Sequence, residues 1–158
     1  VFVSWRALYP AAGVSHNRAR ITGKGHPMAN PLYDALFGRH AGQNTPFLYL
    51  PDGTTVTHAA FVARAARFAG ALGASGLQVG DRVALQIEKS ADALALYAGC
   101  VQAGLVFLPL NPGYTAAEVE YFVSNAGARL LICDPSNADA LAAVCKSRHA
   151  PEDAGPWP

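Results

Sequence analysis

The spacing of the apolar residues changes several times between positions 45 and 145, and each change predicts a different element. From Thr57 onward the apolar positions recur every three or four residues, so that Phe61, Ala65, Phe68 and Leu72 share one face of a helix. Thr57 offers a hydroxyl just before that pattern, which is preferred N-cap chemistry. The pattern therefore predicts an amphipathic helix that begins after Thr57 and buries this face.

Short, nearly continuous apolar runs follow at 83–87, 105–110 and 130–133. Runs of this length without polar alternation are typical of strands that are covered on both faces of a sheet. Pro109 marks the end of the second run, because proline cannot donate to a central strand ladder. The sequence thus predicts three short buried strands.

Helical patterns separate these strands. Ser90 is a predicted N-cap with Asp92 in the first turn, where the helix dipole favours an acid. Thr115 and Glu118 have the spacing of a capping box, in which each side chain satisfies an amide at the helix start. A last short helix is predicted over 137–144.

The alternation of strands with helices predicts an α/β fold with a mainly parallel sheet and helical crossovers. Asp52-Gly53 adds a hairpin-type turn ahead of the first helix. The nearly uncharged stretch 93–110 also fits the length of a membrane span. Because Gln102, Gly104 and Pro109 lie inside it, we favour a buried helix followed by a buried strand.

Charge divides the chain into three segments. Residues 1–27 carry four basic residues, no acidic one and no periodic pattern. We expect a disordered extension, or sequence upstream of a start at Met28; a transit peptide is the alternative. Residues 28–145, with six basic and nine acidic residues, form the expected domain. Residues 146–158 contain three prolines and no apolar period, which predicts a disordered tail.

Composition narrows the class of protein. Hydrophobic residues make up 51% of the 158 positions and charged residues 15%, which indicates one globular domain rather than a disordered chain. The net charge of +1 gives no basic face for nucleic acid. The cysteines Cys100, Cys133 and Cys145 lie far apart, so we expect reduced, core-packed thiols and a cytoplasmic protein.

No residue is assigned a catalytic, cofactor-binding or metal-binding role from the pattern alone. The chain has no phosphate-binding loop, and the glycines at 70, 73 and 76 lie at a predicted helix end. Asp81 and Asp134 are interpreted as turn residues, and Glu88-Lys89 as a solvated pair. For the helical tyrosines Tyr97 and Tyr121 we expect a role in packing.

Two ordered blocks nevertheless resemble the N-terminal part of adenylate-forming acyl-CoA synthetases. "VTHAAFVARAARFAGALGASGLQVGDRVAL" is similar to the opening helix and Gly-Asp-Arg-Val strand entry of that family. "GCVQAGLVFLPLNPGYTAAEVEYFVSNAGARLLICD" is similar to its Ala-Gly and Pro-Leu-Asn block with the helix and strand that follow. Within the family, "LQIEKSADALALYAGCVQAGLVFLPLN" resembles malonyl-CoA synthetases most. The resemblance covers residues 30–143.

The resemblance implies a partial N-terminal domain of the adenylate-forming fold. The family joins a carboxylate to ATP, giving an acyl-adenylate, and then forms a thioester with coenzyme A, with magnesium assisting the first step. Its Ser/Thr/Gly-rich loop, Thr-Glu pair, ribose-binding Asp and C-terminal lysine match no position here. We therefore expect an inactive, truncated synthetase that binds no cofactor itself; ATP, magnesium and coenzyme A belong to the full-length family.

Two other functions stay open at this point. The first is a small nucleotide-binding module that uses the strand ends near Glu88, Asn111 and Asp134. The second is an interaction fragment whose partner is a separate chain that carries the remainder of the enzyme. We expect neither a nucleic-acid nor a membrane partner.

Overall fold

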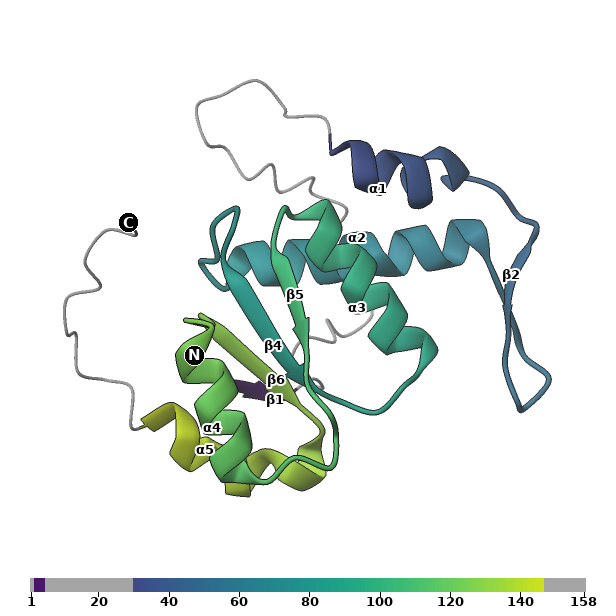
Figure 1. The fold of residues 1–158 in the computed structure, drawn as a ribbon. Coiled ribbons are helices and arrows are strands. Elements are labelled where there is room, and N and C mark those ends of the chain that lie inside the picture. The colour runs from purple at the N-terminus through teal and green to yellow at the C-terminus, as the bar shows by residue number, and fades with distance from the viewer. Residues whose placement is uncertain (1, 5–29, 147–158) are drawn as a thin grey trace.

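A computed structural model describes residues 2–4 and 30–146, and it shows an α/β fold (Figure 1). The strands are β1 (Phe2–Ser4), β2 (Pro46–Tyr49), β3 (Thr55–Thr57), β4 (Arg82–Gln86), β5 (Val106–Pro109) and β6 (Leu130–Cys133). The helices are α1 (Pro31–Leu36), α2 (His58–Ala74), α3 (Ala91–Gln102), α4 (Ala116–Asn125) and α5 (Ala138–Lys146), with short 3-10 turns η2 (Gly38–His40) and η3 (Pro135–Asn137).

The main sheet has the order β1-β6-β4-β5, and all its neighbouring strands are parallel. In the central pair, Val83 lies opposite Leu130 and Leu85 opposite Ile132. Helix α3 connects β4 to β5, and α4 connects β5 to β6, so each parallel step is made by a helical crossover. The predicted parallel α/β sheet is therefore confirmed.

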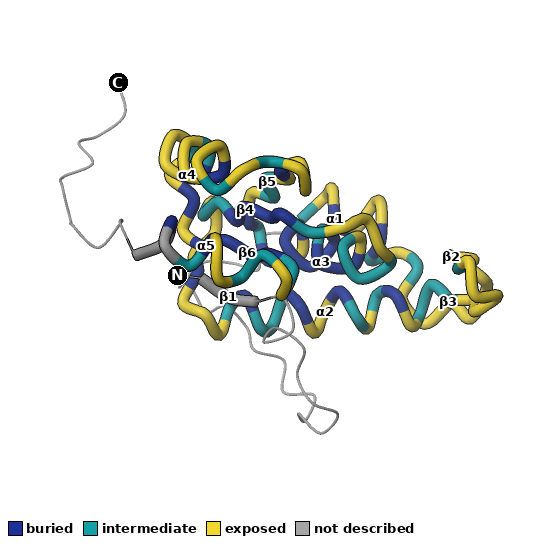
Figure 2. The backbone as a smooth tube through the Cα atoms, turned by 90° about the horizontal axis from the view of Figure 1, so that it is seen from below, coloured by how far each residue is buried: buried dark blue, intermediate teal, exposed yellow. Residues whose placement is uncertain are grey.

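Helices cover both faces of this sheet. Alternate residues of β4 and β6 point to opposite sides: Val83 and Ile132 belong to a core with α2 and α3, whereas Ala84 and Leu131 belong to a core with α4 and α5. Figure 2 shows the buried strands between these two helical layers. The molecule thus has three layers, with two separate cores divided by the sheet.

The predicted helix faces and caps are present. Phe61, Ala65, Phe68 and Leu72 are all buried on α2. The Thr57 hydroxyl accepts a hydrogen bond from the Ala60 amide at 3.2 Å, and the N-cap of α3 is formed in the same way. Local sequence chemistry therefore fixes where these helices begin.

Helices α2 and α3 approach each other very closely at Gly99. A Cβ at this position would lie 2.8 Å from the Ala65 carbonyl oxygen and 2.9 Å from the Cβ of Phe68. Both distances are shorter than a carbon atom can occupy without displacing a neighbour, and one of the contacted atoms is backbone. The α2–α3 contact consequently depends on the absence of a side chain at residue 99.

The hairpin predicted at Asp52-Gly53 is formed by β2 and β3, which pair antiparallel and project from the main body (Figure 1). The Asp52 carboxylate accepts a hydrogen bond from the Thr54 amide at 2.8 Å, and this bond lowers the pKa of Asp52. Gly53 has a φ of 83°, a conformation that favours glycine. The turn chemistry read from the sequence is confirmed.

Strand β5 forms one edge of the main sheet. The Val106 amide donates to the Asp81 carbonyl and the Leu110 amide to the Leu85 carbonyl, so these residues direct their backbone groups toward β4. Because alternate strand residues face opposite sides, Phe107 and Pro109 direct theirs away from β4. In the described part of the chain, the outer side of β5 pairs with no other strand.

The sequence interpretation was wrong for residues 2–4. They were expected to belong to a disordered extension, whereas Phe2–Ser4 forms β1 and pairs with β6. The segment has an apolar start, but Arg6 and Pro10 interrupt it, and three residues are too few to show a period. Residues 5–27 and the predicted tail at 147–158 lie outside the described residues. The interpretation of 93–110 as helix plus strand is confirmed, and no helix in the described residues has the length and apolarity to cross a bilayer.

Candidate functional site

The carboxyl ends of β4 and β6 meet at one edge of the sheet, where open α/β sheets place their ligand-binding groups. Three of the polar residues considered from the sequence, Glu88, Asn111 and Asp134, come together here. The Asp134 carboxylate accepts a hydrogen bond from the Glu88 amide at 2.9 Å. Asp134 thereby ties the loop after β4 to the end of β6, a role beyond the turn residue expected from the sequence.

Gln86 organises this edge and was missed by the sequence interpretation. Its side chain is 1% exposed at the end of β4. The Nε2 atom lies 3.2 Å from the carbonyl oxygens of both Asn111 and Pro112, and 2.8 Å from that of Tyr114. The two protons of this buried amide are shared among the three carbonyl oxygens, and they hold the loop between β5 and α4 against the sheet.

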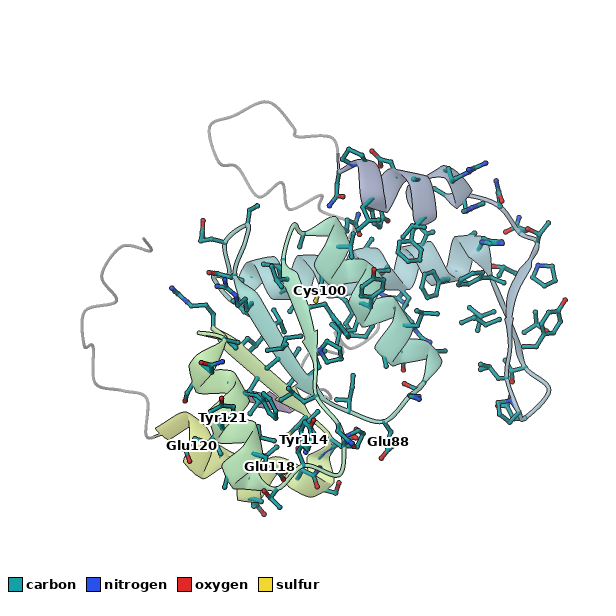
Figure 3. All side chains as sticks on the ribbon, viewed as in Figure 1. Glu88, Cys100, Tyr114, Glu118, Glu120 and Tyr121 are labelled. Atoms are coloured by element: carbon teal, nitrogen blue, oxygen red, sulfur yellow. The ribbon has the colours of Figure 1, made fainter. Side chains whose placement is uncertain are left out.

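The loop held by Gln86 is shaped further by its own side chains. Asn111 Oδ1 accepts a hydrogen bond from the Gly113 amide at 2.9 Å. The ring of Tyr114 stacks on Phe122 of α4, with the ring centroids 5.1 Å apart. Figure 3 shows Tyr114, Glu118 and Glu88 at the same end of the molecule. This edge is called the platform below. It consists of Gln86, Glu88, residues 111–115, Glu118 and Asp134, and its polar groups hold loops in place.

The capping box that starts α4 completes the platform. The Thr115 amide and hydroxyl both donate to Glu118 Oε2 at 2.8 Å, and the Glu118 amide donates to the Thr115 hydroxyl at 3.4 Å. Hydrogen bonds from the Thr115 backbone and then its side chain lower the pKa of Glu118. The carboxylate form of Glu118 is thus the one that closes the helix start.

We expect Thr115→Ala to lower the free energy of unfolding by about 1 kcal/mol, the usual effect of losing an N-cap. Because the folded-state pKa of Glu118 is lowered, its contribution is complete above its ordinary pKa of 4.5 and is lost as the pH falls through the folded value. Urea unfolding at pH 7 and at pH 3.5 measures both effects.

Glu118→Gln should remove part of that loss of stability on acidification, whereas Glu120→Gln removes the same charge from the same helix and leaves the box intact. An equal change in pH dependence for the two variants would contradict the role given to Glu118.

The other candidate residues have structural partners. Asp81 accepts a hydrogen bond from the Gln78 amide at 2.7 Å, which confirms it as a turn residue. Tyr97 contacts Phe37 and Phe107 edge-on, which confirms packing. Tyr121 is 64% exposed, and its ring meets Phe122 at a centroid distance of 5.4 Å.

The structure also tests the cysteine and loop interpretations. Cys100 and Cys133 are buried free thiols, and burial raises the pKa of Cys100 to about 12, which makes it unreactive near neutral pH. The Cys145 side chain lies outside the described residues.

Glu88 and Lys89 have exposed side chains. Among the described residues, no group of three or more His, Cys, Asp or Glu side chains is placed to hold a metal ion.

These features place the chain in a known class. It belongs to the AMP-binding enzyme family, whose model matches residues 37–155. Its fold is that of the N-terminal part of adenylate-forming enzymes, in which the parallel sheet and its helices recur.

Three relatives illustrate the similarity. MatB from Rhodopseudomonas palustris, solved without ligand and with ATP, is 43% identical with a TM-score of 0.71, over 75% of this chain and 24% of MatB. Feruloyl-CoA synthase of an Amycolatopsis species is 38% identical over 61% of this chain and 20% of that protein. The N-terminal domain of FACL13 from Mycobacterium tuberculosis is 26% identical with a TM-score of 0.61, over 77% of this chain and 29% of that domain. The chain therefore spans about a fifth to a quarter of the first two relatives.

Proposed function

We propose that this chain supplies the opening scaffold of an acyl-CoA synthetase, the part of the fold that positions the site without carrying the reacting groups. The reaction joins a carboxylate to ATP with release of pyrophosphate, and the acyl-adenylate then gives its acyl group to coenzyme A. The observation that carries the proposal is the platform edge. There Gln86, Asn111 and Asp134 use their polar groups to hold loops.

Malonate is the carboxylate that we propose for the full enzyme. The support is the sequence block from Leu85 to Asn111, which resembles malonyl-CoA synthetases. This segment includes the end of β4 and the whole of α3 and β5. Residues that contact the carboxylate directly belong, in this proposal, to parts of the fold that the chain does not span.

ATP, magnesium and coenzyme A are proposed as ligands of the full enzyme, and we propose that the groups that bind them come from parts of the fold that this chain does not span. One Asp134 oxygen already accepts the Glu88 amide, and the described carboxylates form no metal-binding cluster. Adenylation also needs fixed donors around the transferring phosphate. In this proposal such a set comes from other parts of the fold, and no step of the reaction is assigned to a residue of this chain.

We expect the purified 158-residue chain to release no pyrophosphate above the blank with malonate, methylmalonate or acetate in the presence of ATP, magnesium and coenzyme A. Loss of a single donor to the developing charge typically lowers the rate by ~10²–10³, and here the whole set is supplied by other parts of the fold. A coupled pyrophosphate assay measures this. Turnover that survives repurification and disappears on Lys89→Ala would overturn the proposal and make Lys89 a catalytic residue.

A second experiment tests the scaffold role directly. Residues 37–143 of this chain replace the matching segment of R. palustris MatB, and the hybrid is assayed with the carboxylate that gives unmodified MatB its highest rate. We expect a soluble hybrid that retains a substantial part of that rate, because the platform is transferred together with every residue of the two cores except Tyr33 and Val144. A matched hybrid with Gln86→Leu should lose rate. A folded but inactive first hybrid would contradict the scaffold role.

A further inference from the structure

Helix α4 presents aromatic side chains on its outward side. Tyr121 is 64% exposed, and its ring meets the edge of Phe122 at a centroid distance of 5.4 Å. Phe122 in turn stacks on Tyr114 with an interplanar angle of 22°. Phe122 and Tyr114 are half-buried at the margin of the core between the sheet and α4. The three rings form a continuous series, called the aromatic ridge below, and its Tyr121 end is open to solvent.

A charged carboxylate lies beside this ridge. Residues three and four positions apart are neighbours on a helix surface, so Glu118 lies next to Tyr121 and Phe122 on α4. The cap at Thr115 uses Oε2 of Glu118 alone, and no described residue donates a hydrogen bond to Oε1. Figure 3 shows Tyr114, Glu118 and Tyr121 together at α4. The ridge is therefore flanked by a carboxylate that the cap holds in place and that has one oxygen left to accept a donor.

Charge decides which partner fits this surface. Residues 30–110 carry five Lys or Arg and five Asp or Glu residues, whereas residues 111–146 carry two and four. Helix α4 itself contains two glutamates and no basic residue. A second copy that met this face across a two-fold axis would bring the same carboxylates together, and like charges at an interface are disfavoured. The surface consequently suits a cationic partner rather than a second copy.

We propose that the aromatic ridge and the Glu118 carboxylate bind an arginine side chain of a partner protein. A guanidinium group is planar, so it can stack on the exposed ring of Tyr121 while its N–H groups donate to Glu118 Oε1. Tyrosine and arginine are both enriched at protein interfaces for this reason. Because the cap already fixes the Glu118 side chain, little ordering is required when the partner arrives.

This inference does not depend on the scaffold role proposed above, and a peptide titration tests it. The probe is the peptide acetyl-Gly-Ser-Arg-Ser-Gly-amide, added to the ¹⁵N-labelled 158-residue chain, and the amide shifts of the chain are followed by NMR. We expect saturable shifts within residues 114–125. The matched control peptide carries citrulline, which replaces the guanidinium by a neutral urea of similar shape. It should bind about fivefold more weakly or worse, because it loses both the cation–π contact and the charge-assisted hydrogen bond.

Variants of the chain assign the binding to the ridge. Tyr121→Ala should weaken the arginine peptide about two- to fivefold, and Tyr121→Phe, which keeps the ring, should retain the affinity. Glu118→Gln keeps an oxygen for the cap but removes the charge, so it should weaken binding by a similar factor. The matched control is Tyr49→Ala, which removes a tyrosine that is 78% exposed on the β2–β3 hairpin and should leave the affinity unchanged.

Three results would overturn the proposal. They are equal affinity for the arginine and citrulline peptides, unchanged affinity in both Tyr121→Ala and Glu118→Gln, and peptide-induced shifts that lie outside residues 114–125. Circular dichroism checks that each variant is folded, and Glu118→Gln decides alone if Tyr121→Ala is not. Shifts of residues 114–125 on raising the protein concentration without peptide would assign this face to a second copy and would also contradict the proposal.

Discussion

Gly99→Val is expected to produce one of the two largest losses of stability in this chain. A Cβ at residue 99 would lie 2.8 Å from the Ala65 carbonyl oxygen and 3.1 Å from the Ala69 amide nitrogen, both of which belong to the backbone of α2. Neither atom can rotate away, so the two helices must separate. Overpacking of this kind typically costs about 1–3 kcal/mol and sometimes more. Urea unfolding followed by circular dichroism measures the change.

Gly99→Ala gives the cleaner comparison, because alanine is also the better helix former by about 1 kcal/mol. We expect a net loss of stability despite that gain. The matched control is Gly70→Ala on α2, where an added Cβ would meet nothing within 4 Å. This control should stabilise the chain by up to about 1 kcal/mol. A Gly99→Ala variant that is as stable as the Gly70→Ala variant would contradict the close approach.

Gln86→Leu is expected to have a comparable effect through a different mechanism. Leucine fits the volume of the buried amide but cannot donate to the carbonyls of Asn111, Pro112 and Tyr114. Leaving buried acceptors without a donor costs about 1–3 kcal/mol. The loss should be concentrated at the platform, so amide exchange should accelerate in residues 111–115 more than in α2. Thermal unfolding and exchange mass spectrometry measure the two effects.

Gln102→Leu serves as the control for this variant. Gln102 is exposed at the end of α3, where a substitution usually changes stability by no more than about 0.5 kcal/mol. Similar losses in both variants, or a Gln86→Leu variant with unchanged exchange at 111–115, would contradict the role of Gln86.

The elements that the sequence predicted well are those specified by neighbouring residues. The capping box needs only Thr115 and Glu118, three positions apart, and the buried face of α2 needs only a regular spacing from Phe61 to Leu72. Such signals act within one turn or one helix and therefore remain visible in the linear chain. Helix α1 was not predicted, because its six residues are too few to show a period.

The features that were missed depend on partners far away in the chain. Gln86 contacts residues 25 to 28 positions later, and β1 pairs with a strand more than 120 positions later. One signal for Gln86 was nevertheless present. A glutamine within a strand that is predicted to be buried on both faces must have a hydrogen-bond partner, which marks it as a residue that organises structure.

The family was identified from the order of two sequence blocks, whereas the site could not be predicted in the same way. A reacting group is recognised by its chemistry and its neighbours, and the carboxyl edge of this sheet contains Asp134 and Gln86 as supports for loops. Their residue types are those of a ligand site, and only their contacts show that they hold the scaffold together.

The outward side of β5 affects whether the strands of two copies of this chain can pair at this edge. Phe107 offers an amide proton on that side, whereas Pro109 has none, so a strand arriving there finds carbonyl acceptors and very few donors. Strand pairing between molecules requires a continuous series of main-chain hydrogen bonds. Pro109 interrupts that series within the four residues of β5. Pro109 therefore interrupts strand pairing at the β5 edge of the sheet.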